Sequence, residues 1–527
     1  MESSKKETDI DTCLEQCGSF GRYQLYLQLL FMVFVLCFGC IPYLPYFILH
    51  DPPWTCRTPA NTTLANTTTN EFCRNHRGEE IASYNKDFHK RCEMKESEWT
   101  STKDMHYSIV TEFQLNCGRS SLADMTTTLF FVGAVISAIV SGKCADTFGR
   151  KITMTVLLTL TVVGSVGCFF VSQLWQLYVL RVIYGMGQPL YNVALIYLME
   201  LMPAKHQSLS GLLYQSPYCF SVLCLDGVGY LVRQWRFLQL YVSLPLCVLF
   251  IPFVFLLESP RWLLANGKLH SAENKLKKIA QFNGVNGKSF TLKLCLPENH
   301  APVTEGSRKY TYLDLLKNRK VAFVVGSQAF MWFTTALLYY MLGLESSRLG
   351  GNIYEVFALS TLFEIPGSFA AIYLCNRYGR KKTILTCFLL SGLLTGAIAT
   401  VPVSYPRRHV VNISLALLAK FFVNIAYCAL YVWSFELIPT VVRSQGMLLF
   451  SVLENSAGLF VPFLVGALQN AMYVLPFIIA SVVTLLAAVL GTRLPETNNR
   501  PTREVFDDFF EPGNKVDPRD VPLEITM

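Results

Sequence analysis

The sequence predicts an all-α membrane protein in which twelve spanning helices form two similar halves. The chain has 527 residues, of which 52% are hydrophobic and 16% are charged, whereas about 25% of the residues of a soluble domain are charged. Twelve stretches approach the roughly 20 mostly apolar residues that a spanning helix needs. The segment 143–151 (KCADTFGRK) returns in altered form at 376–382 (NRYGRKK), each time between two apolar stretches. The repeat indicates a duplicated bundle, an arrangement typical of transporters.

The predicted spans run in order through the chain, some with polar interruptions. They cover 23–49, 123–144, 152–171, 177–201, 209–231, 237–257, 320–342, 351–374, 382–402, 411–437, 446–468 and 471–493. Two of them carry acidic residues: Glu355 and Glu364 in the eighth, and Asp226 in the fifth. Both are retained because the flanking loops require an even number of crossings between them. The predicted organisation is an N-terminus 1–22, a first half 23–257, a linker 258–319, a second half 320–493 and a tail 494–527.

Positive charge sets the expected orientation, because short loops rich in Lys and Arg stay in the cytoplasm. Loops 145–151 and 375–382 and the linker are all basic, so both termini are expected to be cytoplasmic. Residues 1–20 are polar and lack the apolar core of a cleavable signal peptide. We therefore expect the first span to act as the insertion signal. The net charge of +8 belongs to the cytoplasmic face and does not indicate nucleic-acid binding.

The long loop 50–122 is predicted to be extracellular. It holds an even set of cysteines, Cys56, Cys73, Cys92 and Cys117, which suits an oxidising compartment. Four cysteines allow three pairings, and the sequence leaves all three open. Two glycosylation sequons begin at Asn61 and Asn66, and their proximity in a Thr/Asn-rich stretch favours modification over chance occurrence.

Several short motifs accompany the repeated loop. They are SIVTEFQLNC at 108–117, WRFLQ at 235–239, ESPRWLL at 258–264, FELIPTVVR at 435–443 and LPET at 494–497. Together they resemble the organic cation, anion and zwitterion (carnitine) transporter family of the major facilitator superfamily, from about residue 15 to about residue 500. The resemblance implies the major facilitator fold, with two pseudo-symmetric six-helix halves and a layer of short cytoplasmic helices in the linker.

The same resemblance implies a cytoplasmic charge network that gates the movement of the halves. The candidate gating residues are Asp146, Arg150, Lys151, Arg377, Arg380, Glu200, Glu258, Arg261, Glu436 and Arg443, with Glu496 as a further partner. Acidic groups favour helix N-termini and cations favour C-termini. The alternative is that the basic residues only hold the loops inside. For Arg150 and Lys151 alone, gating and topology are equally supported. The recurrence of the motif in the second half favours gating for the whole set.

Candidate substrate residues are polar or aromatic side chains within the spans, where ionisable groups usually face a cavity. The tenth span places Lys420, Asn424, Tyr427 and Tyr431 on one helical face. The other candidates are Glu364, Glu454, Asn455, Trp332, Tyr339, Tyr214, Tyr218 and Asp226. Two alternatives to substrate binding stay open. Glu364 and Lys420 can form a purely structural ion pair, and the row of tyrosines can serve helix packing.

The family pattern leaves the substrate charge open. Cation transporters of this family carry an acidic residue seven positions before the proline of the eleventh span, and anion or carnitine transporters tend to carry arginine there. Here that position is Asn455, before Pro462. Three acids, Asp226, Glu364 and Glu454, stand against one base, Lys420. Aromatic faces attract ammonium groups and an inside-negative potential draws cations inward, so we expect organic cations or zwitterions. The alternatives are an organic anion transporter or exchanger and a non-transporting, receptor-like homologue.

Other functional classes find less support. No P-loop signature of the GxxxxGK[ST] type is present, so transport is expected to be facilitated, exchange-driven or coupled to an ion gradient. The eight histidines are scattered over predicted loops, which argues against intramembrane metal chemistry. No enzyme activity, metal or cofactor is expected. The expected partners are a small organic ion, the lipid bilayer and a co-transported or exchanged ion.

Overall fold

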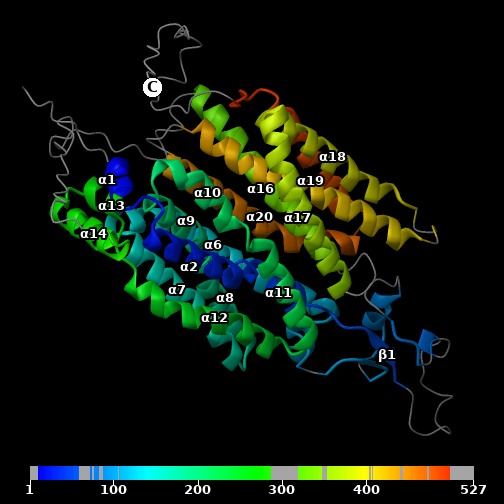
Figure 1. The fold of residues 1–527 in the computed structure, drawn as a ribbon. Coiled ribbons are helices and arrows are strands. Elements are labelled where there is room, and N and C mark those ends of the chain that lie inside the picture. The colour runs from blue at the N-terminus through cyan, green and yellow to red at the C-terminus, as the bar shows by residue number, and fades with distance from the viewer. Residues whose placement is uncertain are drawn as a thin grey trace, which may run out of the picture.

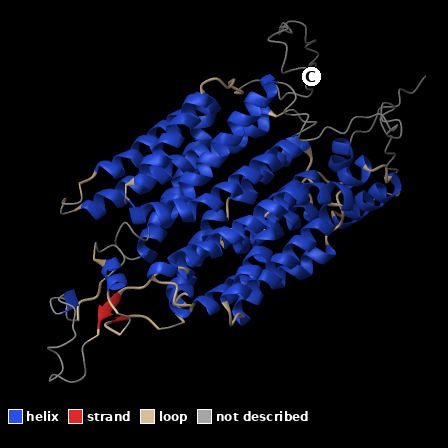
Figure 2. Cartoon of the chain, turned by 180° about the vertical axis from the view of Figure 1, so that it is seen from behind, coloured by secondary structure: helices blue, strands red, loops and turns tan. Residues whose placement is uncertain are grey.

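The computed structural model describes most of the chain as a helical protein with two bundles (Figures 1 and 2). The described residues are 10–57, 72–73, 76, 78–81, 87–95, 97–104, 106–285, 319–346, 353–402, 405, 407–438, 443–471 and 474–498. The blue-to-green helices of the first half lie beside the yellow-to-orange helices of the second (Figure 1). The small strand-containing unit lies at one end of the bundles, and the short helices α1, α13 and α14 lie at the other.

The helices follow the chain order that the hydropathy predicts. The first half contains α2 (Arg22–Phe38), η1 (Ile41–Tyr43), α3 (Leu44–Ile48), α6 (Ser120–Phe148), α7 (Arg150–Gly167), η4 (Cys168–Phe170), α8 (Leu174–Met186), α9 (Leu190–Glu200), α10 (Ala204–Gln215), α11 (Tyr218–Leu231) and α12 (Trp235–Phe255). The second half contains α16 (Arg319–Ser346), α17 (Ile353–Tyr378), α18 (Arg380–Thr400), α19 (Arg408–Leu437), α20 (Arg443–Ala471) and α21 (Leu475–Gly491).

Twelve crossings are accounted for, although not all are single helices. Among the described residues, 9 helical runs are long and apolar enough to cross a membrane, and α21 is a shorter apolar helix of 17 residues. The remaining two crossings are the pairs α8/α9 and α10/α11. Their breaks coincide with Pro189 and Pro217, which stand immediately before α9 and α11. Proline lacks an N–H group and so removes one hydrogen bond of a helix, which favours a break at these two positions.

The spanning helices are apolar around their whole circumference because one side faces lipid and the other faces the bundle. Helix α12 illustrates the division. Its buried side carries Trp235, Leu238, Val242, Leu246, Leu249 and Phe253, and its exposed side carries Phe237, Tyr241, Leu244, Val248, Ile251 and Phe255. Both rows advance by three or four residues, as one face of a helix requires.

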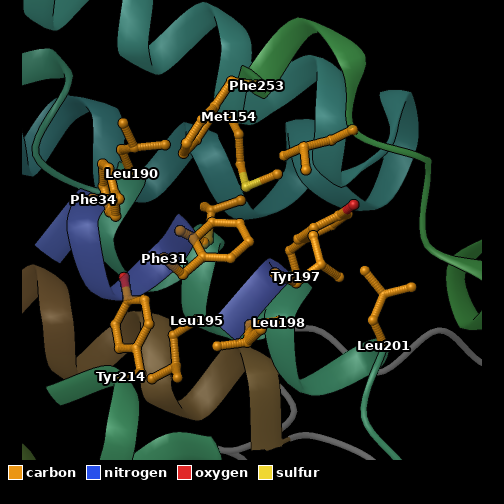
Figure 3. Packing of buried hydrophobic residues seen from close by; sticks show 14 of the residues in the cluster. Phe31, Phe34, Met154, Leu190, Leu195, Tyr197, Leu198, Leu201, Tyr214 and Phe253 are labelled. Carbon is orange, nitrogen blue, oxygen red and sulfur yellow. The ribbon is translucent and has the colours of Figure 1, made fainter. Parts of the chain in front are cut away.

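Buried aromatic side chains form the core of the first half (Figure 3). The ring of Phe31 on α2 lies 5.6 Å from Phe253 on α12 and 5.7 Å from Tyr197 on α9, measured between centroids. Tyr214 of α10 joins the same cluster, with its ring 6.4 Å from Phe31. Contacts between aromatic rings thus hold α2, α9, α10 and α12 together.

The two halves meet along two helix pairs, α6 with α20 and α11 with α17. Gly458 allows the first approach, since a Cβ there would lie 2.5 Å from the ring of Phe131. A hydrogen bond also crosses between the halves, from Asn192 Nδ2 on α9 to Ser451 Oγ on α20 at 2.8 Å. Close packing and a small number of polar contacts are the forces available to helices within lipid.

The cysteine-rich unit, which the sequence predicts to be extracellular, is folded around a short antiparallel pair, β1 (Trp54–Cys56) and β2 (Trp99–Ser101). The disulfides join Cys56 with Cys73 and Cys92 with Cys117, which selects one of the three pairings. The buried Trp54 donates its Nε1–H to the carbonyl of Phe88 at 2.9 Å. Three short helices complete the unit: η2 (Phe88–Glu93), α5 (Ile109–Glu112) and η3 (Cys117–Arg119). Asn61 and Asn66 lie outside the described residues.

At the opposite end of the bundles, α1 (Ile10–Gln16), α13 (Pro260–Ala265) and α14 (Leu269–Phe282) form a layer of short helices, which the sequence predicts to be cytoplasmic. The apolar side of α14, with Ala272, Leu276 and Ile279, is fully buried against α1 and the first half. Cys17 donates its thiol hydrogen to the carbonyl of Leu276. The apolar stripe of α14 therefore packs against protein.

Candidate functional site

A carboxylate surrounded by tyrosines lies where the halves face each other. Glu454 on α20 accepts a hydrogen bond from the hydroxyl of Tyr427 on α19 at 3.1 Å. It also interacts electrostatically with Tyr191 of α9, Tyr340 of α16 and Tyr431 of α19. Among the described residues no ion-pair partner is found for Glu454. The site thus places one carboxyl group among aromatic side chains contributed by both halves.

A second polar cluster lies within the second half. Lys420 of α19 and Glu364 of α17 form an ion pair with 2.9 Å between Nζ and Oε1, and both side chains are buried. Lys420 also donates to Ser360 Oγ at 2.8 Å, and the Tyr339 hydroxyl donates to Glu364 Oε2 at 2.7 Å. Asn424 donates to the backbone carbonyl of Glu364 at 2.8 Å. Neighbouring groups therefore neutralise or hydrogen-bond every charged member of this cluster.

The remaining candidate residues on α16 and α20, Trp332 and Asn455, are bonded to neighbouring protein groups. Trp332 is 2% exposed, donates to Ser434 Oγ at 2.9 Å and packs its ring against Tyr427 and Tyr431. Asn455 turns toward its own helix and donates to the carbonyl of Ser451 at 2.7 Å. The carboxylate beside the tyrosines is thus Glu454, one position before the residue that the family pattern selects.

Tyr214 and Tyr218 both pack their rings against Tyr191 of α9, with centroid distances of 5.2 Å and 6.4 Å, but their hydroxyl groups have different partners. The Tyr214 hydroxyl donates to the backbone carbonyl of Tyr191 at 2.8 Å, within the core of the first half. The Tyr218 hydroxyl lies 2.8 Å from the hydroxyl of Tyr43. Tyr214 therefore holds Tyr191 in place, and Tyr218 belongs to the outer contact between the halves.

Asp226 is separate from both clusters. It lies on α11 toward the outer end, is 8% exposed, and its Oδ1 has no hydrogen-bond partner in the described part of the chain. Its electrostatic neighbour is Tyr354 at the outer end of α17. One turn further along α11, Gly229 faces Phe47 and Tyr354. Asp226 thus lies at the seam between α11 and α17.

Aromatic rings close the outer side of the seam between the halves. Phe357 of α17 lies 5.0 Å from Phe47, 5.7 Å from Tyr46 and 6.0 Å from Tyr43, between ring centroids. The Tyr46 hydroxyl donates to the carbonyl of Tyr340 at 3.3 Å. The ring of Phe47 also stacks on Tyr354 at 5.7 Å. We refer to these contacts as the outer aromatic seam, and they bring the two halves together toward the end of the bundles that carries the disulfide-bonded unit.

The repeated loop motif of the first half, predicted to be cytoplasmic, forms a closed cluster around Arg150. Arg150 pairs with Asp146 at 2.8 Å and with Glu200 at 3.0 Å. Glu258 accepts the backbone N–H groups of Arg150 at 3.0 Å and Lys151 at 3.3 Å, so its carboxylate caps the N-terminus of α7. The indole N–H of Trp262 donates to the carbonyl of Asp146 at 2.8 Å. Two motifs that lie far apart in the sequence thus form one structural unit.

The second half repeats this arrangement. Arg380 pairs with Glu436 at 3.0 Å, as Arg150 does with Glu200. Glu496 accepts the backbone N–H groups of Arg380 at 3.0 Å and Lys381 at 3.1 Å, so it caps α18 as Glu258 caps α7. The glycines before these helices have φ of 105° at Gly149 and 92° at Gly379, a region that favours glycine.

Three further gating candidates lie around these clusters. Arg261 pairs with Asp11 of α1 at 2.6 Å and donates to the carbonyl of Glu200 at 3.0 Å. The guanidinium of Arg377 lies 5.9 Å from the ring centre of Tyr378. The side chain of Arg443 lies outside the described residues. In this conformation the described ion pairs of each cytoplasmic cluster stay within one half.

Sequence reasoning missed several aromatic residues of the site, notably Tyr191, Tyr340 and Tyr43. Only the break at residue 189 hinted at Tyr191, because residues beside a broken span often line a cavity. The placement of all histidines in loops was wrong, since His206, His270 and His409 lie in α10, α14 and α19. Within the described ranges no group of three or more potential metal ligands occurs.

Comparison with known sequences identifies relatives across nearly the whole chain. The model of the "Sugar (and other) transporter" family matches residues 80–509. The chain is 28% identical to organic cation transporter 1 of Caenorhabditis elegans, over 98% of this chain and 91% of the relative. It is 30% identical to solute carrier family 22 member 2 of Rattus norvegicus, over 76% and 71% of the two chains. It is also 30% identical to organic anion transporter 3 of Homo sapiens, over 78% and 75%.

Comparison with solved structures identifies the fold. A proton:xylose symporter of the major facilitator superfamily superposes with a TM-score of 0.61 at 17% identity, over 92% of this chain and 98% of that chain. An inward-open xylose transporter from E. coli gives 0.60 at 16% identity, over 91% and 98%. The twelve-helix fold and the sequence relatives confirm the predicted resemblance. The chain belongs to the sugar (and other) transporter family of the major facilitator superfamily and groups there with the organic ion transporters of solute carrier family 22.

Proposed function

We propose that this protein is a secondary transporter of small organic cations or zwitterions in the plasma membrane, with both termini in the cytoplasm. The observation that carries the proposal is the Glu454 carboxylate, which lies among tyrosines of both halves and has no ion-pair partner in the described helices. A substrate held there contacts both halves at once, as alternating access requires. The organic cation and anion transporters among the relatives support organic ions as the substrate class.

The charge balance favours a positive group on the substrate. Lys420, the main base of the candidate site, is paired with Glu364 at 2.9 Å, so it presents little net positive charge to an anion. Glu454 accepts only the Tyr427 hydroxyl among the described hydrogen bonds. Tyrosine faces add an attraction of roughly 0.5–2 kcal/mol for each cation–π contact. A carboxylate in an aromatic cage is the arrangement that recognises ammonium groups.

The proposed transport cycle depends on the aromatic contacts between the halves and on the charge clusters within each half. The outer aromatic seam is closed here, while the Arg150 and Arg380 clusters each remain within one half. Opening to the outside requires the rings of Phe47 and Phe357 to separate. The halves then approach at the cytoplasmic side, where the two charge clusters face each other. In this proposal the clusters act as a gate that does not touch substrate.

Uptake measurements in cells that express the chain test the proposal. A panel of labelled cations, anions and carnitine-like zwitterions, with and without sodium and at two external pH values, identifies the substrate and any coupling ion. For a transported cation we expect Glu454→Gln to lower uptake by about 10-fold or more, equivalent to about 1.4 kcal/mol. Glu454→Asp retains the charge and should retain part of the uptake. Glu355→Gln, an exposed position at the start of α17, is the matched control.

The same panel separates the alternatives. Uptake confined to anions, lost in Lys420→Ala and kept in Glu454→Gln, contradicts the cation assignment and supports an anion transporter. Binding without flux for every substrate supports a receptor-like role. The orientation is tested with cysteines at Thr147 and Tyr378, in the two repeated loops. Both should react only with reagents that reach the cytoplasm, and labelling on opposite sides contradicts the duplicated fold.

A further inference from the structure

An exposed aromatic pair marks the corner where the cytoplasmic layer meets the first spanning helix. Phe282, at the end of α14, is 55% exposed, and Tyr26 of α2 is 42% exposed. Their ring centroids lie 6.3 Å apart. Tyr26 belongs to the exposed row of α2 that also contains Leu25, Leu29 and Val33, which is the lipid-facing side of a spanning helix. The corner therefore lies at the cytoplasmic boundary of the bilayer, where aromatic rings are enriched.

Asn283 fixes this corner. Its Oδ1 accepts the backbone N–H of Tyr23 at 2.8 Å, and its Nδ2 donates to the carbonyl of Cys17 at 2.7 Å and to Gln24 Oε1 at 3.0 Å. Gly21 permits the approach, because a Cβ there would lie 2.5 Å from Asn283 Cγ. One side chain thus links the end of α14 to the start of α2, and holds Phe282 at a fixed height in the membrane.

The positive charges of α14 are divided between its two flanks. Lys278 and Lys275 precede Phe282 by four and seven residues, so they lie on the flank that carries this ring. Glu273 lies two residues before Lys275 and is therefore on the opposite flank, as is Lys277. The side that turns toward the bilayer is consequently basic and carries no acidic residue of this helix.

Helix α2 adds another cation to the same corner. Arg22 is exposed and lies one helical turn before Tyr26. The corner thus combines Arg22, Lys275 and Lys278 with the exposed rings of Tyr26 and Phe282. Long basic side chains extend along apolar surface to the headgroup layer, and aromatic rings suit the region just below it.

We propose that this corner is a binding site for the headgroup of an anionic phospholipid of the cytoplasmic leaflet. The phosphate and the headgroup carboxylate would be bound by Arg22, Lys275 and Lys278, while Phe282 and Tyr26 contact the glycerol and upper acyl chain. The negative surface of that leaflet supplies the complementary charge. The site would anchor the cytoplasmic layer to the membrane, and it is independent of the transported substrate.

Native mass spectrometry of the full-length protein in detergent micelles tests the site, with phosphatidylserine and phosphatidylcholine added in equal amounts. The wild-type protein should carry bound phosphatidylserine in preference to phosphatidylcholine. Lys275→Gln and Lys278→Gln should each lower this preference by up to about 5-fold, the equivalent of about 1 kcal/mol per basic residue. Lys277→Gln is the matched control, with the same charge change on the opposite flank, and should leave the preference unchanged.

Two results would overturn the proposal. One is an unchanged preference in the Lys275→Gln/Lys278→Gln double variant, and the other is an equal loss in Lys277→Gln, which indicates general charge attraction. Lys275→Arg/Lys278→Arg should restore the preference, and equal thermal unfolding midpoints exclude misfolding as the cause of a loss. Glycerophosphoserine, which lacks acyl chains, should not displace the lipid at equal concentration. Its full competition would assign the corner to free phosphate esters and contradict a lipid site.

Discussion

Lys420 and Glu364 form an ion pair inside the second half, with 2.9 Å between Nζ and Oε1 and side chains only 4% and 2% exposed. Serine, tyrosine and asparagine groups complete the hydrogen bonding around it. The sequence left open whether these two residues bind substrate or each other. Their contact indicates that each neutralises the other, which leaves Glu454 as the charge available to a ligand in the central cluster.

Removal of one member of this pair should destabilise the protein strongly. Lys420→Met leaves Glu364 buried without its counter-charge, and loss of one partner of a buried ion pair typically costs about 3–5 kcal/mol. The double variant Lys420→Met/Glu364→Gln removes both charges and should recover much of the loss. Thermal unfolding of purified protein in detergent measures both effects. Additive losses in the double variant would show that the two side chains act independently.

The glycines of the repeated loops should not tolerate a side chain. Gly149 has φ of 105°, and an added Cβ would lie 2.3 Å from Glu258 Oε2. Gly149→Ala should therefore displace the carboxylate that caps α7, with a backbone strain of about 1–3 kcal/mol. Gly227→Ala in α11, where nothing lies within 4 Å of the added atom, is the control and should be neutral. Equal unfolding midpoints for the two variants would contradict the capping role.

The outer aromatic seam should control access from outside. Phe357→Ala removes the ring that contacts Tyr43, Tyr46 and Phe47, and so weakens the closed state relative to the outward-open one. A membrane-impermeant maleimide added outside should then label Cys219, which lies beside Tyr218 on α11, faster than in the wild type. The increase in labelling caused by Phe357→Ala should disappear when Cys219→Ser is added, whereas any background labelling of the other free cysteines should remain.

Phe388→Ala provides the matched control for this experiment. Phe388 is fully buried in the core of the second half, away from the seam. Its loss should lower stability without raising the labelling rate. If both variants raise labelling equally, the effect is general loosening, and the seam has no gating role.

Acidification should weaken the anchor of the extracellular unit. Glu112 accepts hydrogen bonds from Trp235 Nε1 at 2.7 Å and Arg236 Nη2 at 2.5 Å. Burial raises the pKa of Glu112, but these hydrogen bonds and the Arg236 charge outweigh it, so the pKa lies below its ordinary value of 4.5. A lowered pKa stabilises the fold above the ordinary pKa, and this contribution disappears as pH falls through the folded-state value.

The unfolding midpoint should therefore fall more steeply between pH 5 and pH 3 in the wild type than in Glu112→Gln, which lacks the titrating group. Glu93→Gln, an exposed position in the same unit, should keep the wild-type slope. Parallel curves for wild type and Glu112→Gln would show that this carboxylate does not contribute to the acid sensitivity.

Hydropathy and turn residues predicted much of the fold. The twelve crossings, the cysteine-containing loop and the short helices of the linker follow from patterns that depend only on local sequence. Pro189 and Pro217 are present in the sequence, but the helix breaks beside them were not predicted. The apolar residues around each proline form a continuous hydrophobic stretch, because lipid-facing and core-facing positions have the same composition. The disulfide pairing also required the structure, since it depends on how β1 and β2 align.

The site was predictable in composition but not in arrangement. The tyrosines and Lys420 of α19 were identified from helical spacing, whereas Glu454 was identified only as a charged residue within an apolar span. Which acid stands near which tyrosine depends on contacts between helices that are separated by tens to hundreds of residues. Tyr191 of α9 and Glu454 of α20 come from opposite halves, and no local pattern relates them. Asn455 illustrates this limit. It is the next residue after Glu454, and the rotation of 100° per residue of an α-helix turns its side chain away from the tyrosines.

Glu258 and Glu496 stand at the points where the chain leaves the first and second bundles. Each exit point is also the cap of a helix that begins at a repeated loop. Truncation of the polypeptide that follows a bundle therefore removes a helix cap. A chain shortened before residue 496 would lose the N-terminal cap of α18, and would be expected to fray at that helix even though every span remained intact.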